Sequence, residues 1–174
     1  LGDVYKRQYL YCPKDEWAKF CKINIFLLSV RKYIVEQLGD TDNIKSDGYY
    51  HDLIKAIDMK KLETTTIATT NYNVFIHDVI KRDICYLNGS TGMWYDPYLN
   101  RIGSKEELSV KEEHFLVPLI FTQSGTKPMT SIEMSKQYVK MYDDFKDSDK
   151  ICIIGFGFNP DDEHTVSYTH LTLP

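Results

Sequence analysis

The chain has 174 residues, of which 43% are hydrophobic, 13% aromatic and 26% charged, with only 9 Gly and 6 Pro. This composition excludes a disordered or collagen-like chain and predicts a soluble globular domain. The formal net charge of -4 provides no basic surface for a phosphate backbone, so we expect no nucleic acid partner.

Both ends of the chain resemble translated adapter sequence of the kind found on metagenomic fragments. The segments are LGDVYKRQ at 1–8 and VSYTHLTLP at 166–174, and neither has a capping or periodic pattern. We therefore expect two non-native ends and a single α/β domain at 9–165. The native protein is expected to continue at both ends. An additional domain is expected beyond the C-terminal end.

Two helices are predicted before the first strand. Between Lys14 and Leu38 apolar residues recur at helical spacing, and Gly39 follows, as is typical of a helix C-terminus. After a polar loop, the residues from Tyr49 to Ile57 predict a second, shorter helix.

The following segments alternate between strand and helix. Residues 64–69 are rich in β-branched side chains and predict a strand, which a turn joins to a helix at 74–80. Residues 84–87 predict a short strand, after which 93–95 could form a hairpin. Residues 98–114 are expected to form an exposed polar excursion.

The last part of the chain predicts two strands and two helices. The apolar run at 115–122 and the fully apolar run Ile151 to Ile154 are both expected to be strands. Between them, Thr130 and Glu133 form a capping box for a helix. That helix has one apolar face, formed by Tyr138, Met141, Tyr142 and Phe145. A further helix is expected to begin near Asn159.

Strands that alternate with helices and are apolar on both faces predict a Rossmann-like parallel sheet with helices on both faces. Ligands of such sheets bind outside the carboxyl ends of the strands. In this chain those ends carry TTNYN, LNGS, TQSG and GFGF. These four turns are therefore the predicted binding region.

Taken alone, each residue of these turns also has an ordinary structural role. Asn71 either caps a helix or presents its amide to a ligand, and capping is favoured. Gly89 and Gly155 suit a close backbone approach to a nucleotide but are also common in turns. Asp162, with its acidic neighbours, favours a helix N-terminus, although a ribose hydroxyl is an alternative partner.

Other side chains have similar alternatives. The aromatic residues Trp94, Tyr95 and Tyr98 either stack on a base or belong to the core. Cys85 and Cys152 lie in predicted strands and are expected to be buried.

No C-x-x-C pair and no metal-ligand histidine spacing occurs, so we expect no bound metal and a reduced, cytoplasmic setting. The apolar run at 23–30 is far shorter than the roughly 20 residues of a membrane helix, so no membrane partner is expected.

In chain order, the segments ATTNYNVFIHDVI, YLNGS, TKP and GFGFNPDDEH resemble the sirtuin-like, NAD-consuming domain of bacterial antiphage defence proteins. The resemblance extends from about Thr64 to His164. It implies that the domain binds NAD and hydrolyses it to nicotinamide and ADP-ribose. In that family a TTNYD-type segment supplies an asparagine, here Asn71, and an LHGS-type segment supplies a histidine, here replaced by Asn88.

The resemblance thus implies catalytic positions at Asn71 and Asn88 and no metal. The implied NAD contacts are Thr70, Asn71, Asn73, Gly89, Ser90, Gly155, Phe156, Gly157 and Asp162.

The sequence departs from the family pattern in three respects. The glycine-rich first turn that holds the pyrophosphate has no equivalent, so we expect the domain to be incomplete at the N-terminus. Asn88 cannot accept a proton at neutral pH, and Asp96 or His77 are conceivable substitutes. The four-cysteine zinc module of sirtuin deacylases is missing, which argues against a protein deacylase.

The resemblance implies two alternative functions: an NAD hydrolase, or a catalytically inactive nucleotide-binding module that senses NAD or ADP-ribose. An unrelated α/β domain is the third alternative. A homo-oligomer is compatible with each of them.

Overall fold

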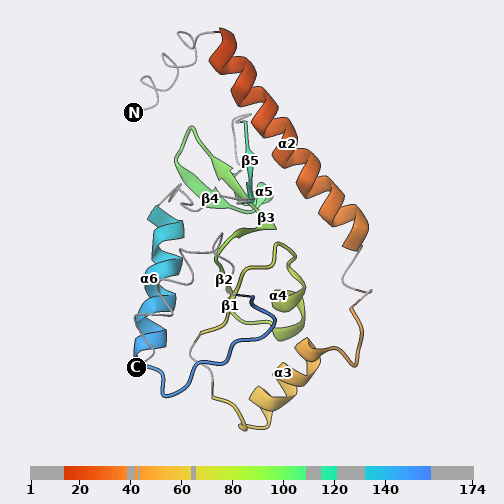
Figure 1. Cartoon of the computed structure of the whole chain (residues 1–174), viewed down its shortest axis with the longest axis vertical. Helices are drawn as coiled ribbons and strands as arrows, with labels where there is room; N and C mark the ends of the chain where they lie inside the picture. Colours follow the sequence, from red (N-terminus) through yellow and green to blue (C-terminus); the bar gives the residue numbers. More distant parts are fainter. Residues whose placement is uncertain are drawn as a thin grey trace.

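The structure is a computed structural model that describes residues 14–38, 42, 44–63, 66–108, 115–120 and 132–157. Figure 1 shows helices arranged around one small parallel sheet and a separate antiparallel sheet. The prediction of a fold that combines helices and strands and contains a parallel sheet is therefore confirmed, whereas the described strands are divided between two sheets.

The two N-terminal helices are formed as predicted. Helix α2 spans Lys14–Leu38 and α3 spans Tyr49–Asp58. Acidic residues in the first turn of α2, Asp15 and Glu16, suit the positive end of the helix dipole. In Figure 1, α2 lies along the antiparallel sheet, where it contacts β5 and β3, and α3 lies beside α4.

The parallel sheet consists of two short strands joined through a helix. Strand β1 spans Ala68–Thr69, α4 spans Phe75–Ile80 and β2 spans Cys85–Tyr86. Ala68 pairs with Cys85 and Thr69 with Tyr86 in parallel register. This strand, helix and strand order was predicted, although the strands are shorter than expected.

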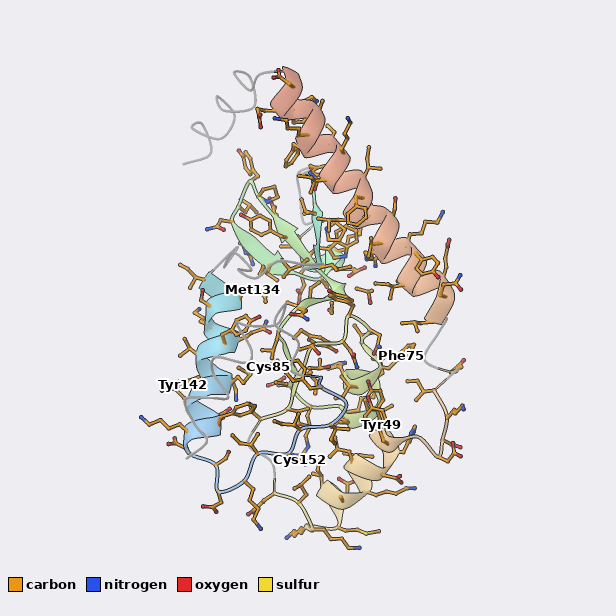
Figure 2. All side chains as sticks on the ribbon, viewed as in Figure 1. Tyr49, Phe75, Cys85, Met134, Tyr142 and Cys152 are labelled. Atoms are coloured by element: carbon orange, nitrogen blue, oxygen red, sulfur yellow. The ribbon has the colours of Figure 1, made fainter. Side chains whose placement is uncertain are left out.

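Helices flank both faces of the parallel sheet. Cys85 and Leu87 belong to a buried cluster with side chains of α6, which spans Ile132–Lys146. Tyr86, between them, packs instead with Ile76 and side chains of α3 and α4. Successive side chains of a strand point to opposite faces, so β2 contributes to two separate cores. Figure 2 shows Cys85 and Met134 on the side of the sheet that α6 covers.

The remaining strands form an antiparallel sheet with the order β4-β3-β5. Strand β3 spans Gly89–Asp96, β4 spans Arg101–Gly103 and β5 spans Val117–Ile120. The expectation that the strand at 115–122 joins a parallel sheet is wrong. Strand β5 instead pairs with β3 in antiparallel register, with Val117 opposite Tyr95. On the other edge of β3, the four-residue turn to β4 is too short for a parallel crossover, which needs about a dozen residues.

The predicted polar excursion at 98–114 is partly structured. It contains β4 and a short helix, α5, at Lys105–Leu108. Leu108 is buried and belongs to the packed interior, so the prediction of a wholly exposed segment is wrong. The sparse apolar residues of this segment gave no indication that Leu108 is buried.

The predicted late strand at 151–154 is not formed. The described residues 151–157 have no strand pairing, and Ile153 and Ile154 are 41% and 59% exposed. Cys152 is exposed, so its predicted burial is also wrong, whereas Cys85 is buried as expected. An apolar run satisfies the composition of a strand but does not supply the neighbouring strand that its backbone needs. The helix expected near Asn159 lies outside the described residues.

Candidate functional site

Two turns meet at the carboxyl ends of the parallel strands. The turn at 70–73 follows β1, and the turn of Leu87 and Asn88 follows β2. The backbone N–H of Leu87 donates to the Thr69 carbonyl at 2.9 Å, and that of Thr91 donates to the Tyr72 carbonyl at 2.7 Å. Of the four turns predicted to form the binding region, TTNYN and LNGS therefore come together, and we call these two turns the paired turns. The TQSG turn lies outside the described residues.

Asn71 is an exposed residue of the first turn and does not cap the following helix. Its backbone N–H donates to the Thr69 hydroxyl at 3.1 Å. Its side-chain Nδ2 donates to the hydroxyl of Tyr50, on α3, at 3.4 Å. The capping interpretation of Asn71 is wrong, and the amide remains at the surface of the turn.

Asn73 is the residue that supports the start of the helix. Its Oδ1 accepts the backbone N–H of Phe75 at 3.2 Å, which satisfies one of the free donors of the first turn of α4. Short polar side chains make this contact in many turns. Asn73 therefore already has a structural task beside its predicted contact with NAD.

Asn88 lies buried where the paired turns touch. It is 6% exposed, and its Nδ2 donates to the Thr70 carbonyl at 3.3 Å. Thr70 and Asn88, both predicted site residues, are thus in direct contact. Ser90, the next predicted contact residue, is 1% exposed at the start of β3. The amide of Asn88 joins the two turns but carries no titrating group.

Gly89 is held close to the neighbouring strand. Its φ is +74°, and a Cβ on it would stand 1.9 Å from the Leu119 carbonyl oxygen. Only glycine fits this combination of positive φ and close approach. The close approach that the sequence suggested for Gly89 is therefore made to β5 of the same chain.

The predicted NAD contacts at 155–157 lie largely at the surface of the part of the chain that the structure describes. Gly155 has a φ of +66°, and a Cβ on Gly155 or Gly157 would meet no atom within 4 Å. Both glycines are exposed and Phe156 is half-buried, so neither glycine is packed against the paired turns. Asp162 lies outside the described residues. The contacts of these four residues with NAD stay predictions.

The two candidate substitutes for a base lie in ordinary structural settings. Asp96 is fully buried, and its Oδ1 accepts the backbone N–H groups of Tyr98 at 2.8 Å and Leu99 at 3.1 Å. Asp96 is the last residue of β3 and Gly89 is the first, so the two lie roughly 20 Å apart along the strand. Asp96 therefore does not act in the paired turns. His77 has a 55% exposed side chain, 3.6 Å from the Asp78 carboxylate.

Two tyrosines near the paired turns were not assigned to the site from the sequence. Tyr50 reaches Asn71, and Tyr86 is 8% exposed beneath it in the α3 and α4 core. Burial raises the pKa of Tyr86 to about 12, and the negative charge of Asp78 adds to the effect. The only signal for Tyr50 in the sequence was its place on the apolar face of the predicted second helix.

Of the aromatic residues Trp94, Tyr95 and Tyr98, Trp94 is buried by contacts with other parts of the same chain. Trp94 is 7% exposed, and the cationic groups of Arg31 and Lys105 lie 4.7 and 5.7 Å from its ring centroid. The core interpretation of Trp94 is therefore confirmed. Tyr95 and Tyr98 are half-buried beside it in the chain.

In the part of the chain that the structure describes, no three His, Cys, Asp or Glu side chains come together as a potential metal site. Within the same ranges, none of the helices has the length and apolar character needed to cross a membrane. Comparison of the chain with protein-family models, curated proteins and solved structures gives no match.

Proposed function

We propose that this chain is a sirtuin-like domain that binds NAD+ and hydrolyses it to nicotinamide and ADP-ribose, in the cytoplasm, as part of antiphage defence. The observation that supports the proposal is the contact between the paired turns. The TTNYN and LNGS segments, which carry much of the resemblance, are hydrogen-bonded to each other at the carboxyl ends of two parallel strands.

The fold proposed with this function is a Rossmann-like parallel sheet with helices on both faces, incomplete at the N-terminus. Support comes from β2, whose Cys85 packs toward α6 and whose Tyr86 packs toward α3 and α4. The parallel strands β1 and β2, joined through α4, have the connection that this fold repeats.

In the proposed reaction the bond between nicotinamide and ribose breaks while positive charge develops on the ribose. The chain therefore needs polar groups that hold the ribose and a water molecule in line. Asn71 suits this task because its exposed carboxamide can accept or donate a hydrogen bond without ionising. Thr70, Asn73, Gly89 and Ser90 would border the same ligand.

Asn88 favours a second candidate function, a catalytically inactive module that senses NAD or ADP-ribose. It occupies the position where the family carries a histidine, and its Nδ2 is engaged by the Thr70 carbonyl. An amide cannot remove a proton from a ribose hydroxyl. Binding without turnover is the outcome expected of this second candidate.

The test measures binding and cleavage on the same protein. NAD+ and ADP-ribose are added to the chain, the melting temperature is recorded, and released nicotinamide is quantified by chromatography. A raised melting temperature with nicotinamide release supports the hydrolase, and a raised melting temperature alone supports the sensing module. If neither ligand raises the melting temperature, both candidates are wrong.

Asn71→Ala assigns the activity to the paired turns. Because Asn71 is exposed and caps no helix, the variant should fold with an almost unchanged melting temperature yet release no nicotinamide. The control is Asn100→Gly, which keeps the left-handed backbone of the turn between β3 and β4 and should keep the activity. Equal nicotinamide release by Asn71→Ala and the parent would exclude Asn71 from the site.

A further inference from the structure

We infer that Tyr50 is a positioning residue that fixes the orientation of the Asn71 carboxamide. The inference rests on the proposed function, because it assigns Tyr50 a task in that same site. It starts from a contact between two elements that are 21 residues apart in sequence, the first turn of α3 and the turn after β1.

Tyr50 is well placed to hold another side chain. Its ring is half-buried against the apolar cluster of Ile76, Ile80 and Tyr86, so the position of its hydroxyl is set by packing. Asn71, by contrast, is exposed. The hydroxyl of Tyr50 therefore acts as the fixed partner and the amide of Asn71 as the group that is held.

The direction of the hydrogen bond decides what the amide offers to a ligand. A carboxamide carries a donor on one side and an acceptor on the other, and rotation by a half turn exchanges them. Here Nδ2 donates to Tyr50, so Oδ1 is left on the opposite side as an acceptor. Such an oxygen suits a hydroxyl or water donor, which is the chemistry of a ribose and its attacking water.

The neighbouring tyrosines do not share this role. Tyr49 precedes Tyr50 but is 53% exposed, and the two rings, 4.3 Å apart, are tilted against each other. The hydroxyl of Tyr86 is buried without a hydrogen-bond partner among the described residues. Figure 2 shows Tyr49 near Phe75, where α3 and α4 meet.

The first test probes the surroundings of the Asn71 side-chain amide by NMR and needs no measurement of enzymatic activity. The side-chain amide signals of Asn71 are assigned in a ¹⁵N NMR spectrum by their loss in Asn71→Ala. In Tyr50→Phe these two signals should shift, whereas they should not move in Tyr33→Phe, a change at a 64% exposed tyrosine of α2. Unchanged Asn71 signals in Tyr50→Phe would overturn the inference, whatever the protein does with NAD+.

The second test reads the effect on the proposed reaction. Loss of one neutral hydrogen bond that orients a reacting group should lower kcat about 3- to 10-fold, with KM nearly unchanged. The coupling between the two residues is read from the free energy of unfolding, because Asn71→Ala should release no nicotinamide. Tyr50→Phe should destabilise Asn71→Ala less than it destabilises the parent, since its partner is already gone. Additive losses in the double variant would contradict the positioning role.

The two tests separate the inference from the function on which it rests. A parent protein that neither binds nor cleaves NAD+ would overturn the proposed function and the part of Tyr50 in it. The NMR comparison would still decide whether Tyr50 orients Asn71. A parent that cleaves NAD+ together with unmoved Asn71 signals would overturn the inference alone.

Discussion

The guanidinium group of Arg31, on α2, lies over the indole ring of Trp94, in β3, with 4.7 Å between Cζ and the ring centroid. The Nε of Arg31 also donates to the backbone carbonyl of Thr91 at 2.7 Å. Both contacts join the first described helix to the central strand of the antiparallel sheet. Arg31 therefore attaches α2 to the strand that begins at the paired turns.

Replacement of Arg31 by alanine should lower the free energy of unfolding by about 2 kcal/mol. A cation over an aromatic ring and a charged donor on a carbonyl each contribute about 1 kcal/mol. Chemical denaturation measures the change. Lys32→Ala, at the next position, removes only a surface pair with Glu36 and should change little. Equal stability of the two variants would contradict the role of Arg31.

Gly89→Ala should be far more destabilising than an alanine substitution at an exposed glycine. The new Cβ would stand 1.9 Å from the Leu119 carbonyl oxygen on a backbone with φ of +74°, so β3 and β5 must separate locally. We expect a loss of about 3 kcal/mol or more, or failure to fold. Gly157→Ala, whose Cβ meets no atom of the described residues within 4 Å, is the control and should retain the parent melting temperature.

Tyr86 should make the protein less stable at alkaline pH. Its pKa is raised from 10 to about 12, because burial disfavours the phenolate. The folded state binds the proton more tightly than the unfolded chain, so stability present below pH 10 is lost as the pH rises toward 12. The slope approaches about 1.4 kcal/mol per pH unit for one group.

The Tyr86→Phe variant isolates this contribution. Its free energy of unfolding should fall less steeply between pH 10 and 12 than that of the parent. At neutral pH the variant should be at least as stable as the parent, because the buried hydroxyl has no hydrogen-bond partner among the described residues. Identical slopes for parent and variant between these pH values would show that Tyr86 titrates as it does in the unfolded chain.

Asn88→His should raise the rate of NAD+ cleavage. Imidazole titrates near neutrality and can accept a proton from a ribose hydroxyl, which the Asn88 amide cannot do. The gain should follow a histidine pKa in the pH profile, and Asn88→Gln, which adds no base, should show none. A fast parent and a slower histidine variant would mean that Asn88 itself is part of a different catalytic arrangement.

The sequence predicted the elements best where the pattern was long or the connection short. Helix α2 begins and ends at the predicted residues, because 25 residues give a clear period. The parallel pairing of β1 with β2 also follows from the sequence, since a strand, a helix and a strand in close succession favour it. The meeting of Thr70 with Asn88 then follows from that pairing.

The antiparallel sheet was largely missed for a physical reason. The segment GSTGMWYD contains two glycines and was interpreted as a turn with a short hairpin, yet it forms the whole of β3. Glycine is needed at position 89 because the Leu119 backbone leaves no room for a side chain. This requirement comes from the packing of β3 against β5 and cannot be recognised from the local sequence. For the same reason the contact of Tyr50 with Asn71 could not be foreseen, because it depends on how α3 packs beside α4.

The connection between the two sheets determines how the site region can open. Only Leu87 and Asn88 lie between β2 and β3; both are buried, and the Leu87 carbonyl accepts the Tyr138 hydroxyl of α6. A buried link of two residues has no slack, so neither sheet can detach while the other stays folded. Amide hydrogens of β2 and of the start of β3 should therefore exchange with deuterium together, at the rate of global unfolding.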